Sequence, residues 1–460
     1  MLSIRLPRLE LDDLLVQLER AGRRSVAVCE AGERRTADGL QLIYRGPGAI
    51  GGSMERSLES IVARGLRPLL VWWGRDFPPA RVVQSWVGDL ELAGSRRGAV
   101  LAVVEQDEDV VISGLVLDKG KVQPLDWASL PGPGMLRSRV WPLWRPPSED
   151  ELGGRSQQRP VAGGGAGEVA REGRWSRLQM AVGDGSMPRG QEVLKRAAEL
   201  RAFVLGCGRA GELMVWRLAE NGIGDQGALV LADSDLVDAP NLGGILPARA
   251  VGMPKAQAVS AISAGLSGHR SIIPMIADLG NRAVVGAIAE SDVLFTCVDN
   301  AEARLAAAIL CSRYGIVHVD IAGGAAYTQS RRVAIGGEVR VALPGSSGCV
   351  ACMENADWSQ AVGRLSMSAD EQRRRRTGQR WWEQRPGSWH DVLLPVVGEA
   401  VQELFRVLQG KRRRSVWLHY AHGNEDLPVW EDWSRRLPFR SAPCRACSQD
   451  GLRGLGDLGL

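Results

Sequence analysis

The strongest constraint on the fold is a regular alternation of apolar runs and amphipathic stretches that begins at residue 201. Strand-like runs such as RAFVLG, ALVLAD and DVLFTCVD are each followed by a stretch with helical spacing. Five such alternations predict a doubly wound, mostly parallel α/β sheet, because a parallel strand needs a crossover helix before the chain returns to the sheet. Further on, RRVAIGGEVRVALPG predicts an antiparallel strand, and Leu393 to about Gln409 a long helix.

The chain of 460 residues is too long for one ordinary hydrophobic core and divides by composition into three parts. Residues 1–143 contain a helical pattern from Leu9 to Leu18 and strand-like runs such as LQLIY and AVLAVV, which predict a small α/β domain. Residues 144–172 are dense in Gly, Pro and charge and predict a flexible linker. Residues 173–460 form the second predicted domain.

Composition places the chain among soluble globular proteins, because 45% apolar and 24% charged residues is an ordinary ratio. No apolar run approaches the roughly 18–20 residues that span a bilayer, and charges interrupt the N-terminus where a signal peptide needs an apolar stretch. We therefore expect a cytoplasmic protein with no membrane partner. The net charge of +4 is small for this length and does not indicate a nucleic-acid partner.

The first strand of the alternation ends in LGCGRAG, which places Gly206, Gly208 and Gly211 in the spacing of a nucleotide-binding turn. Glycine permits the tight turn, the close approach of a phosphate and the packing of helix on strand. Asp233 ends the next strand, where it suits an acceptor for a ribose hydroxyl. By itself this pattern is a weak signal, and its default interpretation is a dinucleotide-dependent dehydrogenase.

Further motifs separate this chain from a dehydrogenase. The run DSDLVDAPNL, followed by VGMPK, resembles the D-x-D-x-V-x-x-x-N-L and V-G-x-P-K segment of the MoeB/ThiF and ubiquitin-activating enzyme family. FTCVDNAEARL resembles the family's C-x-D-N-x-x-x-R strand end, and GRWSRLQ resembles its entry motif R-Y-S-R-Q. The resemblance covers roughly residues 174–450 and implies a Rossmann-like domain that uses ATP and Mg²⁺ to adenylate a carboxylate.

The resemblance also implies a role for each matching residue. The residues that match Asn241 and Lys255 hold the triphosphate and stabilise charge at the α-phosphate. The residue that matches Asp299 binds Mg²⁺, and the arginine that matches Arg177 reaches the phosphates. The matching nucleotide-binding positions also include Asp233 and Asp235.

Carboxyl adenylation requires residues of these types. A carboxylate that attacks the α-phosphate brings two anions together, so the site must supply positive charge and fixed dipoles. Lys255, Arg177 and Mg²⁺ on Asp299 would supply them, and no general base is needed because the nucleophile is already an anion. The alternative is that Asp299 only caps the helix that follows and that Lys255 lies in solvent.

One departure from the family pattern concerns an arginine that usually follows the N-L pair and points at the leaving pyrophosphate. Here the run is Asn241, Leu242, Gly243, Gly244 and Ile245. Arg209, inside the glycine turn, or Arg249 could replace it. If neither does, we expect a catalytically weakened scaffold that recruits ubiquitin-like and conjugating proteins.

Two C-x-x-C pairs, GCVAC and PCRAC, contain Cys349, Cys352, Cys444 and Cys447. Four thiolates suit a closed, structural Zn²⁺ site, and the resemblance supports one because many family members have it in this domain. The long separation leaves open two reduced pairs without metal. No cysteine lies between Cys352 and Cys444, where a ubiquitin-activating enzyme carries its thioester-forming residue, so we expect direct transfer of the adenylate to an external nucleophile.

The N-terminal region has a fainter resemblance to JAB/MPN metalloproteases. VWWGRDFPPARVVQSWVGDLEL follows their H-x-H-P…S…D signature, with Ser85 and Asp89 roughly in place. Gly74 and Asp76 occupy the positions of the two zinc-binding histidines, so we expect a non-catalytic domain. An unrelated small α/β domain remains the alternative.

The partners implied by the resemblance are a ubiquitin-like or sulfur-carrier protein and, as acceptor, a conjugating enzyme or a sulfur donor. A homodimer is also expected. Two alternatives remain at this point: the weakened scaffold, and an NAD-dependent oxidoreductase, which Asn241 and Lys255 disfavour.

Overall fold

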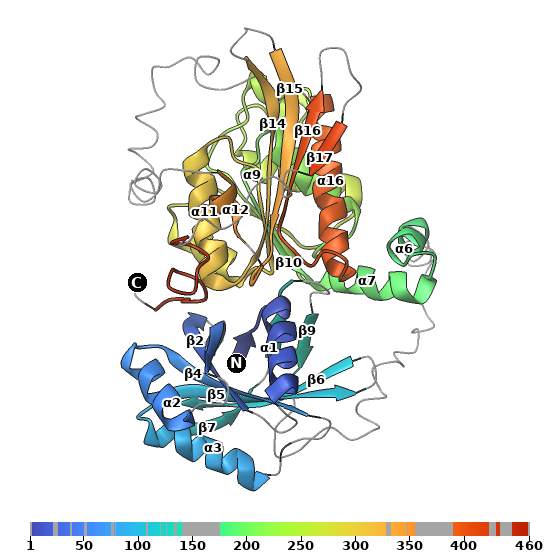
Figure 1. The fold of residues 1–460 in the computed structure, drawn as a ribbon. Coiled ribbons are helices and arrows are strands. Elements are labelled where there is room, and N and C mark those ends of the chain that lie inside the picture. The colour runs from blue at the N-terminus through green and yellow to red at the C-terminus, as the bar shows by residue number, and fades with distance from the viewer. Residues whose placement is uncertain are drawn as a thin grey trace.

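The computed structural model describes most of the chain (Figure 1). The described residues are 2–21, 26–36, 39–49, 53–74, 78, 80–106, 109–119, 121–125, 127–132, 136–139, 175–327, 333–346, 348–354, 390–422, 429–432 and 444–458. The expected linker at 144–172 lies outside them, as does Asp76. Among the described helices, none is long and apolar enough to cross a membrane.

The parallel sheet predicted from the alternating pattern is present. Its neighbouring strands are β12 (Ile272–Met275), β11 (Ala228–Ala232), β10 (Arg201–Leu205), β13 (Val293–Thr296) and β14 (Val317–Tyr327). The chain order reverses at β10, because β11 and β12 lie on one side of it and β13 and β14 on the other. In this architecture ligands bind at the carboxyl ends of the strands, beside such a switch point.

Helices cover both faces of this sheet, as the doubly wound prediction requires (Figure 1). One face packs against α8 (Arg209–Glu220), α9 (Lys255–Ser267) and α16 (His390–Leu408), and the other against α10 (Arg282–Glu290) and α11 (Ala301–Tyr314). Successive side chains of a strand point to opposite faces. Accordingly, Val204 lies in the core under α8 and α16, whereas Phe203 lies in the core under α10 and α11.

The sheet continues beyond β14 in antiparallel order, as the sequence predicts. The additional strands are β15 (Val333–Ala342), β16 (Val416–His422) and β17 (Val429–Asp432). The mixed α/β fold class expected from the sequence is thus confirmed.

The N-terminal region forms a second sheet with its own cores. Its strand order is β7 (Lys121–Pro124), β6 (Asp109–Asp118), β5 (Arg97–Gln106), β4 (Arg67–Gly74), β2 (Val26–Thr36), β3 (Gly39–Ala49), β1 (Leu2–Arg5), β8 (Trp127–Leu130) and β9 (Leu136–Arg139). Helix α1 (Arg8–Ala21) packs on one face, and α2 (Met54–Ala63) and α3 (Ala80–Leu92) on the other. The helix predicted from Leu9 to Leu18 lies within α1, whereas α2 and α3 were not predicted individually.

The positions that resemble the metalloprotease signature lie on a strand and the helix after it. Gly74 ends β4, and α3 follows with Ser85 and Asp89. Gly74 has no side-chain atom that could bind zinc. The non-catalytic character of this domain stays a prediction.

The N-terminal sheet contacts the parallel-sheet region at the end remote from the switch point. The buried Arg5 of β1 donates from Nη1 to the carbonyl oxygens of Ala289 at 3.1 Å and Tyr314 at 2.9 Å. These carbonyls end α10 and α11, where the helix dipole favours a cation. Because α11 begins beside β13 and spans about 20 Å, this contact lies well away from the strand carboxyl ends.

Candidate nucleotide and carboxylate site

The predicted glycine turn joins β10 to α8 at the switch point. Gly206 adopts φ +92°, a conformation that side chains disfavour. A Cβ at Gly211 would lie 1.9 Å from the carbonyl oxygen of Gly206, so helix and turn can pack this closely only with glycine. Gly208 precedes the first residue of α8, where the helix leaves N–H groups for an anion.

Asp233 follows β11 and fixes the glycine turn by a hydrogen bond. Its carboxylate accepts hydrogen bonds from the backbone N–H of Cys207 at 2.7 Å and of Asp235 at 2.8 Å. Burial raises the pKa of Asp233, and the nearby Lys255 partly opposes that effect. Asp233 therefore connects the glycine turn with the segment that carries Asp235.

Lys255 is the first residue of α9 and points back toward the same carboxylates. Its Nζ lies 3.2 Å from Oδ2 of Asp235, and the residue is 8% exposed. This placement contradicts the alternative of a solvated lysine. A buried ammonium beside the glycine turn can stabilise a phosphate, because little water screens it.

The segment after Asp235 brings Asn241 and Arg209 together. Asn241 Oδ1 accepts a hydrogen bond from the backbone N–H of Asp238 at 3.0 Å and closes a short 3-10 turn. Arg209, at the start of α8, donates from Nη2 to the carbonyl oxygens of Pro240 at 3.0 Å and Leu242 at 2.7 Å. Its guanidinium thus lies on the turn that lacks the family arginine, whereas Arg249 is exposed on a separate 3-10 turn.

Glu212 belongs to this site but was not predicted from the sequence. It is 1% exposed, and no described residue donates a hydrogen bond to its Oε1. A Cβ at Gly244 would lie 1.6 Å from that oxygen. The carboxyl group therefore occupies the space above Gly244, and the Gly243–Gly244 pair that replaces the family arginine was the available signal.

Glu212 should make stability depend on pH. Burial raises its pKa from 4.5 to about 7, although Arg209 partly opposes the shift. The stabilising protonated state is complete below pH 4.5 and is lost as the pH rises through 7. We expect Glu212→Gln to remove this loss, so its free energy of unfolding should exceed that of wild type by a margin that grows over this window to at most about 3 kcal/mol. Urea unfolding at several pH values measures this difference in stability. Glu199→Gln is the control, because Glu199 is exposed. A difference that does not change with pH contradicts the raised pKa of Glu212.

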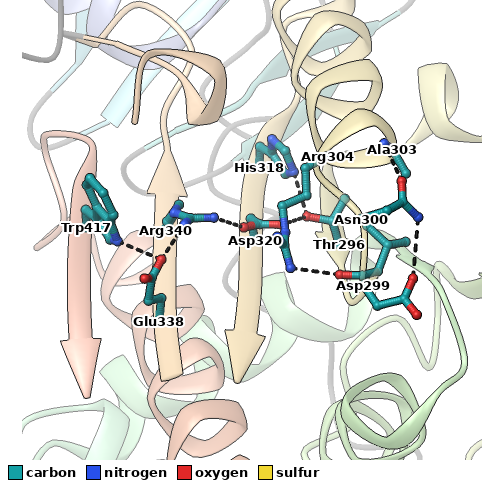
Figure 2. A network of polar contacts seen from close by, with 11 residues as sticks. Thr296, Asp299, Asn300, Ala303, Arg304, His318, Asp320, Glu338, Arg340 and Trp417 are labelled. Atoms are coloured by element: carbon teal, nitrogen blue, oxygen red, sulfur yellow. Dashed lines mark hydrogen bonds and ion pairs between the residues drawn. The ribbon is translucent and has the colours of Figure 1, made fainter. Parts of the chain in front are cut away.

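The loop after β13 places Asp299 just beyond the carboxyl end of that strand (Figure 2). The side chain of Asn300 accepts from the backbone N–H of Ala303 at 2.8 Å and caps α11. The alternative role of Asp299 as the helix cap is therefore wrong. Asp299 itself is exposed, so its carboxylate can meet a metal ion.

Within one chain, Arg177 lies far from the glycine turn and the other residues predicted to bind the nucleotide. It is exposed on α6 (Ser176–Val182), and the preceding Trp175 donates from Nε1 to the carbonyl oxygen of Glu220 at 3.0 Å. Glu220 ends α8, whereas the glycine turn precedes its first residue, about 17 Å away along the helix axis.

The four paired cysteines converge on one point. Their Sγ atoms all lie within 4.8 Å of one another, with 3.8 Å between Cys349 and Cys352 and 3.6 Å between Cys352 and Cys447. Four thiolates around Zn²⁺ at about 2.3 Å require sulfur separations of about 3.8 Å, so the donor set fits tetrahedral zinc. Among the described residues this is the single group of three or more candidate metal ligands.

The remaining thiols, those of Cys29, Cys207, Cys297 and Cys311, are buried. Burial raises the pKa of each of them above its ordinary value. A buried neutral thiol is a poor nucleophile, which agrees with the expected structural role.

The doubly wound sheet, its glycine turn and the buried lysine at the switch point define a nucleotide-binding domain. The model of the ThiF family matches residues 182–424, which is more than half of the chain. The chain therefore belongs to the ThiF family and has its adenylyltransferase fold.

Solved structures provide a distant comparison, whereas no curated protein matches the chain. E. coli MccB with ATP has 15% sequence identity and a TM-score of 0.43, over 76% of this chain and 98% of that chain. MccB with MccA-N7isoASN has 15% identity and a TM-score of 0.44 over the same shares of the two chains. PaaA has 15% identity and a TM-score of 0.41, over 61% of this chain and 89% of that chain.

Proposed function

We propose that this protein uses ATP to adenylate the C-terminal carboxylate of a ubiquitin-like or sulfur-carrier protein. The observation that carries the proposal is the buried Lys255 at the switch point, beside the glycine turn and the Asp233–Asp235 segment. A dehydrogenase has no need of a buried ammonium there, since hydride transfer develops no charge at a phosphate. Membership of the ThiF family supports the same reaction.

In the proposed reaction a carboxylate oxygen of the carrier attacks the α-phosphorus of ATP. A bond forms between them, the bond from the α-phosphorus to the bridging oxygen of the β-phosphate breaks, and pyrophosphate leaves with the electron pair. Lys255 offsets charge at the α-phosphate, and the N–H groups at the start of α8 hold the phosphates. Mg²⁺ would be held by Asp299 and would neutralise phosphate charge.

The product is an acyl-adenylate, and we propose that it passes directly to an external nucleophile. The four cysteines outside the zinc cluster are buried with raised pKa values, so none suits a thioester with the carrier. The acceptor in this proposal is a sulfur donor, the cysteine of a conjugating enzyme or a lysine.

We further propose a homodimer. Arg177 lies near the end of α8 opposite to the glycine turn, so it can contribute to a phosphate site only across an interface with a second copy. A dimer that brings α6 of one copy to the glycine turn of the other would complete the set of cations.

The second candidate function is a scaffold with the adenylation fold and weakened catalysis. Gly244 stands where the family arginine is expected, and the Glu212 carboxyl occupies the space above it. When it is ionised, above its raised pKa of about 7, this carboxyl group disfavours an anionic leaving group unless Arg209 offsets it.

Pyrophosphate exchange into ATP, with candidate carriers and Mg²⁺, tests the proposed function and separates the two candidates. We expect carrier-dependent exchange that Arg209→Ala lowers by roughly tenfold or more, because its guanidinium supports the 240–242 turn. Arg249→Ala is the matched control and should change little, since Arg249 is exposed on another turn. Nucleotide binding without exchange for any carrier favours the scaffold, and hydride transfer from NADH refutes both.

A further inference from the structure

A row of polar residues crosses the sheet beside the Asp299 loop (Figure 2). Thr296 of β13, Asp320 of β14, Arg340 of β15 and Trp417 of β16 are successive cross-strand partners in the sheet register. The row lies where the parallel strands end and the antiparallel extension begins. Polar residues at this depth need mutual pairing to offset the loss of water.

Asp320 is the centre of this row and is fully buried, at 0% exposure. Its Oδ2 accepts from Arg340 Nη1 at 2.9 Å, and its Oδ1 accepts from Arg304 Nε at 3.1 Å and from the Thr296 hydroxyl. Although burial raises the pKa of Asp320, the two guanidinium groups hold it below its usual value. The residue is therefore a buried carboxylate between two arginines.

Arg304 connects Asp320 with the loop that carries Asp299. While Nε contacts Asp320, Nη2 donates to the carbonyl oxygen of Val298 at 2.8 Å. Val298 directly precedes Asp299, so one planar guanidinium fixes both the carboxylate and the peptide before the proposed metal ligand. Asn300 holds the other side of the loop by capping α11.

The opposite end of the row is held by Glu338 and Trp417. Arg340 also pairs with Glu338, which accepts from Trp417 Nε1 at 3.1 Å, and the Arg340 guanidinium lies 5.1 Å from the Trp417 ring centroid. These contacts orient Arg340 toward Asp320. They lie two or three strands from β13 and its loop, and none involves Arg304.

We propose that Asp320 is a positioning residue for the metal site: through Arg304 it fixes the Val298–Asn300 loop, so that Asp299 is held ready for Mg²⁺. The inference rests on the proposed function, because that function assigns the metal to Asp299. It predicts that loss of the Asp320–Arg304 contact weakens metal binding and leaves metal-free nucleotide binding in place. A role in sheet stability alone would affect both equally or neither.

The test is calorimetric binding of a non-hydrolysable ATP analogue to the full chain, in EDTA and at graded Mg²⁺ concentrations. Asp320→Asn and Arg304→Lys should each raise the Mg²⁺ concentration for half-maximal enhancement of binding by about tenfold or more, as for other residues that orient a metal ligand. Binding in EDTA should stay within about twofold of wild type, because the glycine turn and Lys255 are untouched.

Arg304→Lys keeps the test decisive if Asp320→Asn does not fold, because it breaks the same contact from the other side. A lysine retains the charge beside Asp320 but cannot bind it and the Val298 carbonyl with the same planar group. Trp417→Phe is the control, and it should leave the Mg²⁺ requirement unchanged because it alters only the far end of the row.

Asp299→Ala distinguishes a failure of the positioning role of Asp320 from a failure of the metal assignment to Asp299. If it abolishes the Mg²⁺ enhancement while Arg304→Lys and a folded Asp320→Asn bind Mg²⁺ as wild type does, the positioning role is refuted and the proposed function stands. If Asp299→Ala leaves the Mg²⁺ requirement unchanged, the metal assignment and the positioning role both fail.

Discussion

Lys255→Ala and Asp299→Ala should each lower the rate of carrier adenylation by roughly a hundredfold or more. Lys255 is 8% exposed, so its ammonium acts in a weakly screened environment where the loss of one charge is costly. Asp299 lies on a loop held from both sides, and alanine there would remove the carboxylate proposed to hold Mg²⁺. Steady-state pyrophosphate release with a saturating carrier measures the effect.

The kinetic parameters of Lys255→Ala show whether Lys255 acts mainly on the transition state or on ATP binding. Lys255→Ala should lower kcat more than it raises the KM for ATP, because its contact strengthens as charge develops at the α-phosphate. Lys195→Ala, on the exposed side of α7 (Met187–Glu199), is the control and should keep the wild-type rate. If Lys255→Ala and Asp299→Ala each lower the adenylation rate by less than tenfold, the roles assigned to these two residues are contradicted.

Cys447→Ser should remove about one Zn²⁺ per chain and destabilise the protein by at least about 4 kcal/mol. Cys447 closes the four-cysteine group and begins a C-terminal segment that connects both sheets. Arg45 of β3 donates to the carbonyl oxygens of Gln449, Gly451 and Arg453 in this segment, and the hydroxyl of Tyr314 donates to Asp457 at 2.9 Å. Without the metal the segment loses its anchor, so both regions should be affected.

Metal analysis and thermal unfolding together measure this prediction. A loss of about 4 kcal/mol corresponds to a fall in Tm of roughly 10 °C for a domain of this size. Cys311→Ala is the control, because Cys311 is a buried thiol outside the cluster and should leave the zinc content unchanged. Wild-type protein without metal, and a Cys447→Ser variant of unchanged stability, would refute the structural zinc site.

The parallel sheet could be predicted because its strands carry their own signal. Runs such as RAFVLG are apolar on both faces, and the helices between them pack apolar residues against the sheet. The strands β1, β7, β8 and β9 gave no comparable pattern, because their sequences, LSIR, KVQP, WASL and LRSR, are short and are not apolar on both faces. Their pairing is set by distant parts of the chain, which sequence periodicity does not report.

The positions of the site residues were less predictable than their identities. The sequence indicated that Asp299 and Asn300 follow a strand, but either can cap a helix, and only the structure assigns the cap to Asn300. The contact of Arg209 with the 240–242 turn depends on how a loop folds back on α8. Asp320 and Glu212 stood in ordinary apolar runs, and nothing local indicated that they would meet Arg304 and Gly244.

The most direct test of the proposed function is intact mass spectrometry of a candidate carrier after incubation with the full chain, Mg²⁺ and ATP. We expect a carrier whose mass rises by one adenylyl group, with equimolar pyrophosphate and no bond from the carrier to the enzyme that a reductant releases. Lys255→Ala should slow the appearance of the modified carrier by roughly a hundredfold or more. A carrier that stays unmodified under conditions where the protein binds ATP would contradict carboxyl adenylation as its activity.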